Sequence, residues 1–125
     1  MKDFEKFVKH LKLEAIALAV LMLVLTAESR FSLWVIPATF LFFDAGMIGY
    51  IKDEKIGAKL YNLSHSLFIP TLMIALGILI SKDIVSVIGY CWTFHIATDR
   101  GLGYGLKMQS SFHHTHLGTI KNKKK

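Results

Sequence analysis

The sequence predicts an all-α integral membrane protein, a bundle of four membrane-spanning helices. The first observation is that 53% of its 125 residues are hydrophobic and stand in four blocks instead of at amphipathic spacing. The second is that the longer blocks hold about 20 residues, enough to cross a hydrocarbon core roughly 30 Å thick. The third is that basic residues concentrate in alternate segments between the blocks. Together these observations favour a polytopic bundle.

The spans and a basic tail form one predicted domain, with boundaries at about 11–28, 31–50, 61–81, 84–100 and 119–125. The first and fourth apolar blocks are short, so we expect their helices to extend into flanking polar residues or the bilayer to thin locally. A soluble four-helix bundle is the alternative, but it needs a polar face, and residues 15–25 have none. A cleaved signal peptide is disfavoured, because the first run ends in the poor cleavage sequence Leu-Thr-Ala-Glu.

The distribution of positive charge predicts the topology. Thirteen of the fifteen basic residues lie in the leader, in the loop 51–60 or after Asp99, and only Arg30 and Lys82 lie in the other connections. The positive-inside bias therefore places both termini in the cytoplasm of a multi-pass plasma-membrane protein. The net charge of +6 does not indicate nucleic-acid binding, because the basic residues lie in short segments beside apolar blocks. The expected partner is the lipid bilayer.

Five ionisable residues lie within the predicted spans or at their ends, namely Glu14, Asp44, His65, His95 and Asp99. The topology places all five in the cytoplasmic half of the membrane, on four different helices. Charged groups in a membrane are costly and usually face the bundle interior, so we expect one polar cavity that opens to the cytoplasm. His95 and Asp99 are four residues apart and share a helical face.

The end of the fourth span predicts a chain reversal. Three alternate glycines between residues 101 and 105 permit a tight turn beyond Asp99. The turn would fold a short C-terminal segment back at the cytoplasmic side. We expect His116 to join the cavity, whereas His113 and His114 should not.

Packing signals accompany these ionisable residues. Pro70 lies inside the third span and is expected to kink it above the site. Cys91 is the only cysteine, which excludes an internal disulfide and a cysteine-based zinc cluster. Small residues that would let the helices approach closely are Gly46, Gly49, Gly77 and Gly89.

Six short motifs carry a resemblance to a known family. They are Lys12-Leu13-Glu14, the run Asp44 to Tyr50, Tyr61 to His65 with Pro70, His95-Ile96 with Asp99-Arg100, the run Gly103 to Lys107, and Thr115 to Gly118. With these motifs the chain resembles the small bacterial membrane proteins catalogued as domain of unknown function 4260. Phe43 departs from the family pattern, in which a proline precedes the aspartate. The resemblance implies a compact four-helix membrane domain and no established activity.

The leading functional hypothesis is a metal-dependent, membrane-embedded hydrolase that acts on a lipid-like substrate. Three protein ligands and a water are the usual plan of a catalytic zinc site, so a divalent metal such as zinc is the expected cofactor. The candidate ligands are His65, His95, Asp99 and His116. A remaining carboxylate would accept the proton of the water, with candidates Glu14 and Asp44. The candidate substrate-binding residues are Tyr61, Asn62, Arg100, Tyr104 and Lys107.

Two other function classes stay open. One is a small transporter or proton-translocating protein, for which a homo-oligomer would be needed to make room for a pathway. The other is a structural or partner-binding membrane protein, in which the same polar groups form a hydrogen-bonded plug. A haem held by His65 and His95 is disfavoured, because carboxylates accompany both histidines.

Overall fold

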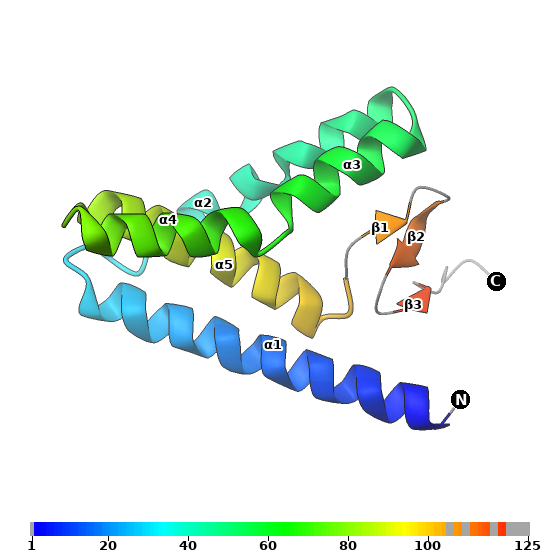
Figure 1. Cartoon of the computed structure of the whole chain (residues 1–125), viewed down its shortest axis with the longest axis horizontal. Coiled ribbons are helices and arrows are strands. Elements are labelled where there is room, and N and C mark those ends of the chain that lie inside the picture. The colour runs from blue at the N-terminus through cyan, green and yellow to red at the C-terminus, as the bar shows by residue number, and fades with distance from the viewer. Residues whose placement is uncertain (1, 105–106, 109–110, 116–117, 120–125) are drawn as a thin grey trace.

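The computed structural model describes residues 2–104, 107–108, 111–115 and 118–119 (Figure 1). The helices are α1 (Lys2–Glu28), α2 (Val35–Thr39), the 3-10 helix η1 (Phe40–Ile51), α3 (Glu54–Ser64), α4 (Phe68–Leu79) and α5 (Asp83–Gly101). The predicted helical architecture is thus confirmed for the main body of the chain. The structure also contains a small antiparallel sheet that was not predicted. Its strands are β1 (Lys107–Met108), β2 (Ser111–Thr115) and β3 (Gly118–Thr119).

Helix α5 lies at the centre of the arrangement. Figure 1 shows α1 along one side of α5 and α4 along another, and the contacts between backbones agree. Within the described part of the chain, α1 and α4 make no backbone contact with each other. Helices η1 and α3 pair as a hairpin, and β1 and β2 lie against α3. The buried core cluster consists of Met22, Ile36, Phe43, Val87, Tyr90 and Cys91.

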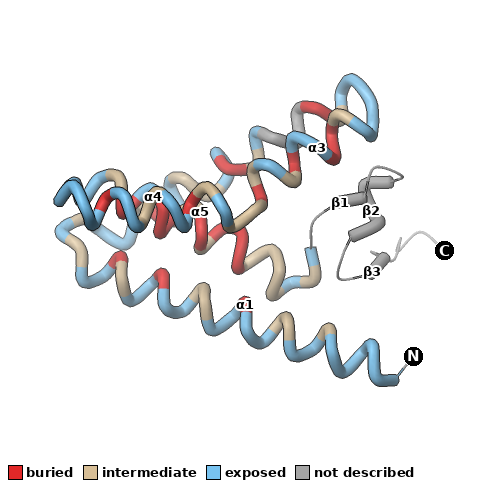
Figure 2. The backbone as a smooth tube through the Cα atoms, viewed as in Figure 1, coloured by how far each residue is buried: buried red, intermediate tan, exposed pale blue. Residues whose placement is uncertain are grey.

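Two helical segments are long and apolar enough to cross a membrane. They are α1 and the α3–α4 pair, which together cover Glu54–Leu79. In each, only 17% of the most apolar 18-residue window is buried, and Figure 2 shows the outer faces of α1 and α4 as largely exposed. Exposed apolar faces of this extent fit a lipid environment better than water. Helix α1 begins at Lys2, so it runs through the polar leader, as expected for the first block.

The second and third predicted spans are not continuous α-helices. Residues 40–51 of the second form a 3-10 helix, in a segment where two glycines lower the helix propensity. The third is interrupted after α3. At the start of α3, Asp53 caps the first turn by accepting a hydrogen bond from the Ile56 amide at 2.7 Å. Pro70 lies in the first turn of α4, where its missing N–H is not required. The predicted kink therefore lies just before the proline.

Helices α4 and α5 cross closely at glycines. A Cβ atom at Gly89 would lie 2.9 Å from the carbonyl oxygen of Pro70, closer than van der Waals contact allows. Gly77 faces α5 with similarly little space, and Gly49 faces α3. The predicted packing role is confirmed for these three, while the surroundings of Gly46 lie outside the description.

Candidate metal centre

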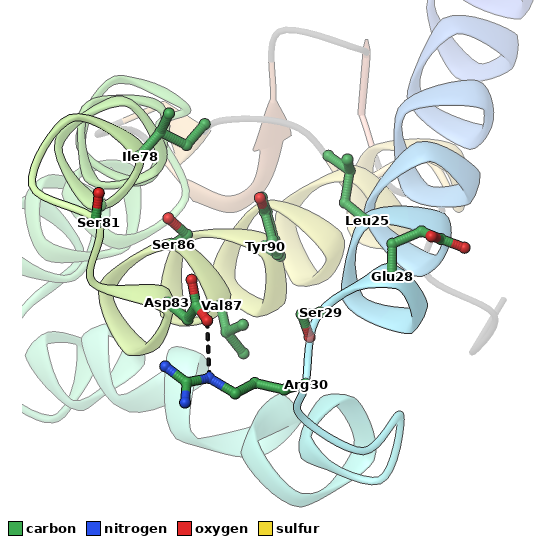
Figure 3. A pocket seen from close by; sticks show the side chains of 11 residues that line it. Leu25, Glu28, Ser29, Arg30, Ile78, Ser81, Asp83, Ser86, Val87 and Tyr90 are labelled. Atoms are coloured by element: carbon green, nitrogen blue, oxygen red, sulfur yellow. Dashed lines mark hydrogen bonds and ion pairs between the residues drawn. The ribbon is translucent and has the colours of Figure 1, made fainter.

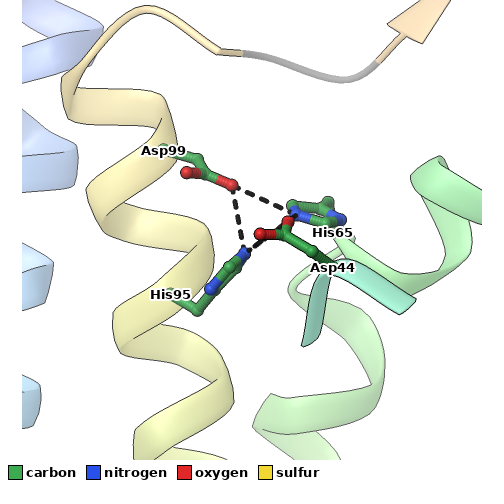
Figure 4. A group of neighbouring side chains, drawn as sticks. All are labelled: Asp44, His65, His95 and Asp99. Atoms are coloured by element: carbon green, nitrogen blue, oxygen red, sulfur yellow. Dashed lines mark hydrogen bonds and ion pairs between the residues drawn. The ribbon is translucent and has the colours of Figure 1, made fainter. Parts of the chain in front are cut away.

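Four side chains from three helical segments meet beside α5 (Figure 4). The Nε2 atom of His95 lies 3.1 Å from Oδ1 of Asp44 and 3.2 Å from Oδ2 of Asp99. The Nε2 atom of His65 lies 3.4 Å and 3.1 Å from the same two oxygens. The two Nε2 atoms are 3.1 Å apart. Sequence positions 44, 65, 95 and 99 thus converge on one point.

These separations match the edges of a metal-coordination tetrahedron. Nitrogen and oxygen ligands about 2.0–2.1 Å from a tetrahedral zinc ion lie about 3.3–3.4 Å from one another. Five of the six separations here are 3.1–3.4 Å, and all four ligand atoms lie within 4.8 Å of one another. Each Nε2 atom carries at most one hydrogen, so hydrogen bonds alone do not account for all these contacts. The cluster could hold a metal ion.

His65 is oriented by the end of α3, where it is the C-cap residue. Its Nδ1 atom lies 3.1 Å from the Tyr61 carbonyl oxygen and 2.9 Å from Oγ of Ser64. In the tautomer that donates from Nδ1 to this carbonyl, Nε2 presents its lone pair to the cluster. The Tyr61 ring also stacks on the imidazole, with centroids 3.9 Å apart and 9° between the planes. The ring is therefore fixed by contacts on one face and on Nδ1.

The interruption between α3 and α4 frees backbone carbonyl groups, and α5 supplies donors to them. Nε1 of Trp92 donates to the Ser64 carbonyl at 2.5 Å, and Arg100 donates to the His65 carbonyl at 3.4 Å. Backbone carbonyl groups outside a regular helix need such internal partners where they are shielded from water. One helix thus contributes two cluster residues and also fixes the loop that carries a third.

His95 is fully buried, under two aromatic rings of η1. The centroids of Phe40 and Phe43 lie 4.3 Å and 5.9 Å from the centroid of its imidazole. A 3-10 helix has three residues per turn, so these phenylalanines share one face of η1. Asp44 follows on the same turn and reaches the cluster. Within the described residues, Nδ1 of His95 has no hydrogen-bond partner.

Asp99 is positioned by the C-terminal cap of α5. The Tyr104 amide donates to the Asp99 carbonyl at 2.8 Å, and the Gly103 amide donates to the Arg100 carbonyl at 3.1 Å. Gly103 has φ +98°, and this pattern is a Schellman motif. The predicted turn is therefore made at Gly103, while Gly101 is the last helical residue and position 105 lies outside the described residues.

The histidine side chains of the cluster are buried, whereas its carboxylates are partly exposed to solvent. The side chains of His65 and His95 are 3% and 0% exposed, whereas those of Asp44 and Asp99 are 33% and 18% exposed. A small molecule can therefore approach from the carboxylate side.

The other predicted site residues are distributed around the cluster. Glu14 is exposed on α1 and, with Arg100, lines a cavity of about 160 Å³ between α1 and α5, so it does not belong to the cluster. Asn62 is half-buried on α3 and Tyr104 follows α5. The backbone of Lys107 lies in β1, and position 116 is outside the described residues.

Three supporting residues were not predicted from the sequence, namely Phe40, Ser64 and Trp92. Trp92 precedes His95 by three positions, a spacing that places both on one helical face. That spacing can be read from the sequence. The hydrogen-bond acceptor of Trp92 cannot, because the Ser64 carbonyl is available only where the predicted third span is interrupted.

A family model described as a domain of unknown function (DUF4260) matches residues 8–120. No curated protein and no solved structure matches the chain.

Proposed function

We propose that this chain, which belongs to the DUF4260 family of unknown function, is a membrane-embedded, metal-dependent hydrolase of lipid-like substrates. The observation that carries the proposal is the set of two imidazole nitrogens and two carboxylate oxygens beside α5, in which five of the six separations are 3.1–3.4 Å. Zinc is the metal we assign, because mixed nitrogen and oxygen ligands in a tetrahedron suit it. Bound there, it would act as a Lewis acid and lower the pKa of a coordinated water to about 7.

Catalysis requires one open coordination position, and Asp44 is the group that can provide it. Its side chain is the most exposed of the four. We assign His65, His95 and Asp99 as the residues that would hold the metal, and Asp44 as the general base that would accept the proton of the attacking water. The water oxygen attacks the carbonyl or phosphoryl centre of an ester, the bond to the alcohol oxygen breaks, and Asp44 returns the proton to the leaving alcohol.

The proposed location is the plasma membrane, with four spans forming a bundle and both termini in the cytoplasm. Support comes from the apolar, exposed faces of α1 and of α3–α4 and from the basic residues beside the predicted cytoplasmic ends. The metal centre would then open to the cytoplasmic leaflet, where an amphipathic ester can reach it.

The test compares metal content and ester hydrolysis in detergent-purified protein. The probes are p-nitrophenyl butyrate, bis-p-nitrophenyl phosphate and a fluorogenic phospholipid in mixed micelles. We expect about one zinc per chain and hydrolysis of at least one probe that a chelator abolishes. Asp44→Asn should retain zinc and lose at least about 100-fold in rate, as expected for loss of a general base. A variant that loses zinc instead would show that Asp44 is a permanent ligand of a closed, non-catalytic site.

Metal transport is the second candidate. The observation that favours it is the interrupted helix between α3 and α4, since discontinuous helices hold ions in many transporters. Zinc uptake into proteoliposomes, measured with an internal fluorescent indicator, separates the two functions. Uptake without hydrolysis would support transport.

A further inference from the structure

A second cavity lies at the end of α5 opposite to the metal centre (Figure 3). Its volume is about 600 Å³, and its walls are the C-terminal ends of α1 and α4 and the first turns of α5. Ser86, in its wall, precedes Asp99 by thirteen residues, or roughly 20 Å along a helix that rises about 1.5 Å per residue. The cavity is therefore separate from the metal centre.

Two side chains in the wall of this cavity carry hydroxyl groups. They belong to Ser86 and Tyr90, which are only 6% and 9% exposed and line the cavity on one face of α5. Both hydroxyls face the same space, so they can donate hydrogen bonds to acceptor groups of one ligand.

The other residues that line the cavity favour an amphipathic ligand. Leu25, Ile78 and Val87 give the cavity apolar walls. At the rim, Nε of Arg30 donates to Asp83 at 2.8 Å, and the guanidinium side chain is 76% exposed, so its terminal N–H groups face outward. The carboxylate of Glu28 is also at the rim. The cavity thus combines an apolar wall, two hydroxyl donors, and side chains of both charge signs.

We propose that this cavity binds the head group and ester region of a zwitterionic glycerophospholipid. Arg30 would pair with the phosphate and Glu28 with the ammonium group. The hydroxyls of Ser86 and Tyr90 would donate to the ester carbonyls, and the first carbons of an acyl chain would lie against Leu25. The site holds an intact lipid and needs no metal.

The experiment is native mass spectrometry of the full chain in detergent, with dioleoyl phosphatidylethanolamine as the probe. Wild type should retain one lipid per chain. The double variant Ser86→Ala, Tyr90→Phe removes only two oxygen atoms and should bind about tenfold more weakly, the effect of losing two ordinary hydrogen bonds. Arg30→Gln should weaken binding to a similar extent. The matched control is Thr71→Ala, a hydroxyl deletion on the exposed face of α4, which should leave binding unchanged.

Dioleoylglycerol, which lacks the phosphate and ammonium groups, should bind more weakly than the phospholipid and should not respond to Arg30→Gln. Equal retention of the phospholipid by the double variant and by Thr71→Ala would overturn the proposal. Equal binding of both lipids to wild type would also overturn it. His65→Ala with His95→Ala should retain the lipid, so failure of the metal centre and failure of the lipid site are distinguishable.

Discussion

The Nε2 atoms of His65 and His95 face each other at 3.1 Å, although His65 follows α3, His95 lies on α5, and the two are thirty positions apart. With its hydrogen on Nδ1 and donated to the Tyr61 carbonyl, His65 would present the lone pair of Nε2 to the second imidazole. Two carboxylates contact the same nitrogens. A shared cation accounts for all these contacts at once.

Removal of either histidine should abolish metal binding. We expect His65→Ala and His95→Ala each to lower zinc affinity at least about 100-fold, because loss of a ligand should exceed the 10–100-fold effect of losing a residue that hydrogen-bonds to a ligand. Elemental analysis of purified protein measures this. His10→Ala, on the exposed N-terminal part of α1, is the control and should keep its zinc. Retention of zinc by both histidine variants would refute the metal assignment.

Asp99→Asn should also lose the metal while the protein still folds. The amide keeps the shape of the side chain but removes the charge, and the backbone cap through Tyr104 and Gly103 is unaffected. Metal content and the size-exclusion profile are the two measurements. Asp83→Asn, at the opposite end of α5, is the matched control. If Asp99→Asn bound zinc as wild type does, α5 would supply only a histidine to the site.

Trp92→Phe should destabilise the protein and weaken zinc binding together. The substitution leaves the Ser64 carbonyl without its donor, and an unpaired buried acceptor costs about 1–3 kcal/mol. Thermal unfolding in detergent and zinc titration report the two effects. Trp34→Phe is the control, because Trp34 is 79% exposed. An unchanged zinc affinity in Trp92→Phe would mean that the loop keeps its shape without α5.

The topology predicts accessibility from opposite sides of the membrane. In a Cys91→Ser background, Ser29→Cys should react with an impermeant thiol reagent added to intact cells, and Asn122→Cys should react only after lysis. The reason is the excess of basic residues in the predicted cytoplasmic segments. The reverse labelling pattern would place the metal centre toward the outside.

The role of His116 stays a prediction. We expect His116→Ala to reduce zinc content or activity as much as His65→Ala, whereas the double variant His113→Ala, His114→Ala should change little. Truncation after Ser110 gives an independent measurement of the same point. Unchanged zinc content and activity in the truncated chain would show that the helices alone form the site.

The sequence determined the helical class, the apolar faces and the four cluster residues as candidates for one polar cavity. These properties follow from local regularities: apolar blocks of helical length, and the four-residue spacing that puts His95 and Asp99 on one face. It also indicated the chain reversal after Asp99, because only a residue tolerant of positive φ suits the position that Gly103 occupies.

Only the tertiary structure decided how these parts combine. The break that turns His65 toward α5 depends on donors from Trp92 and Arg100, which are distant in sequence. The convergence of Asp44 with the histidines depends on a 3-10 helix, a conformation that hydrophobic periodicity does not reveal. Glu14 carries the same chemistry as Asp44 but lines a different cavity, because α1 packs on another side of α5. The position of a residue along the chain is enough to predict its depth in a membrane. Contact between four side chains also depends on how each helix is rotated about its own axis, and only the packing of the helices sets that rotation.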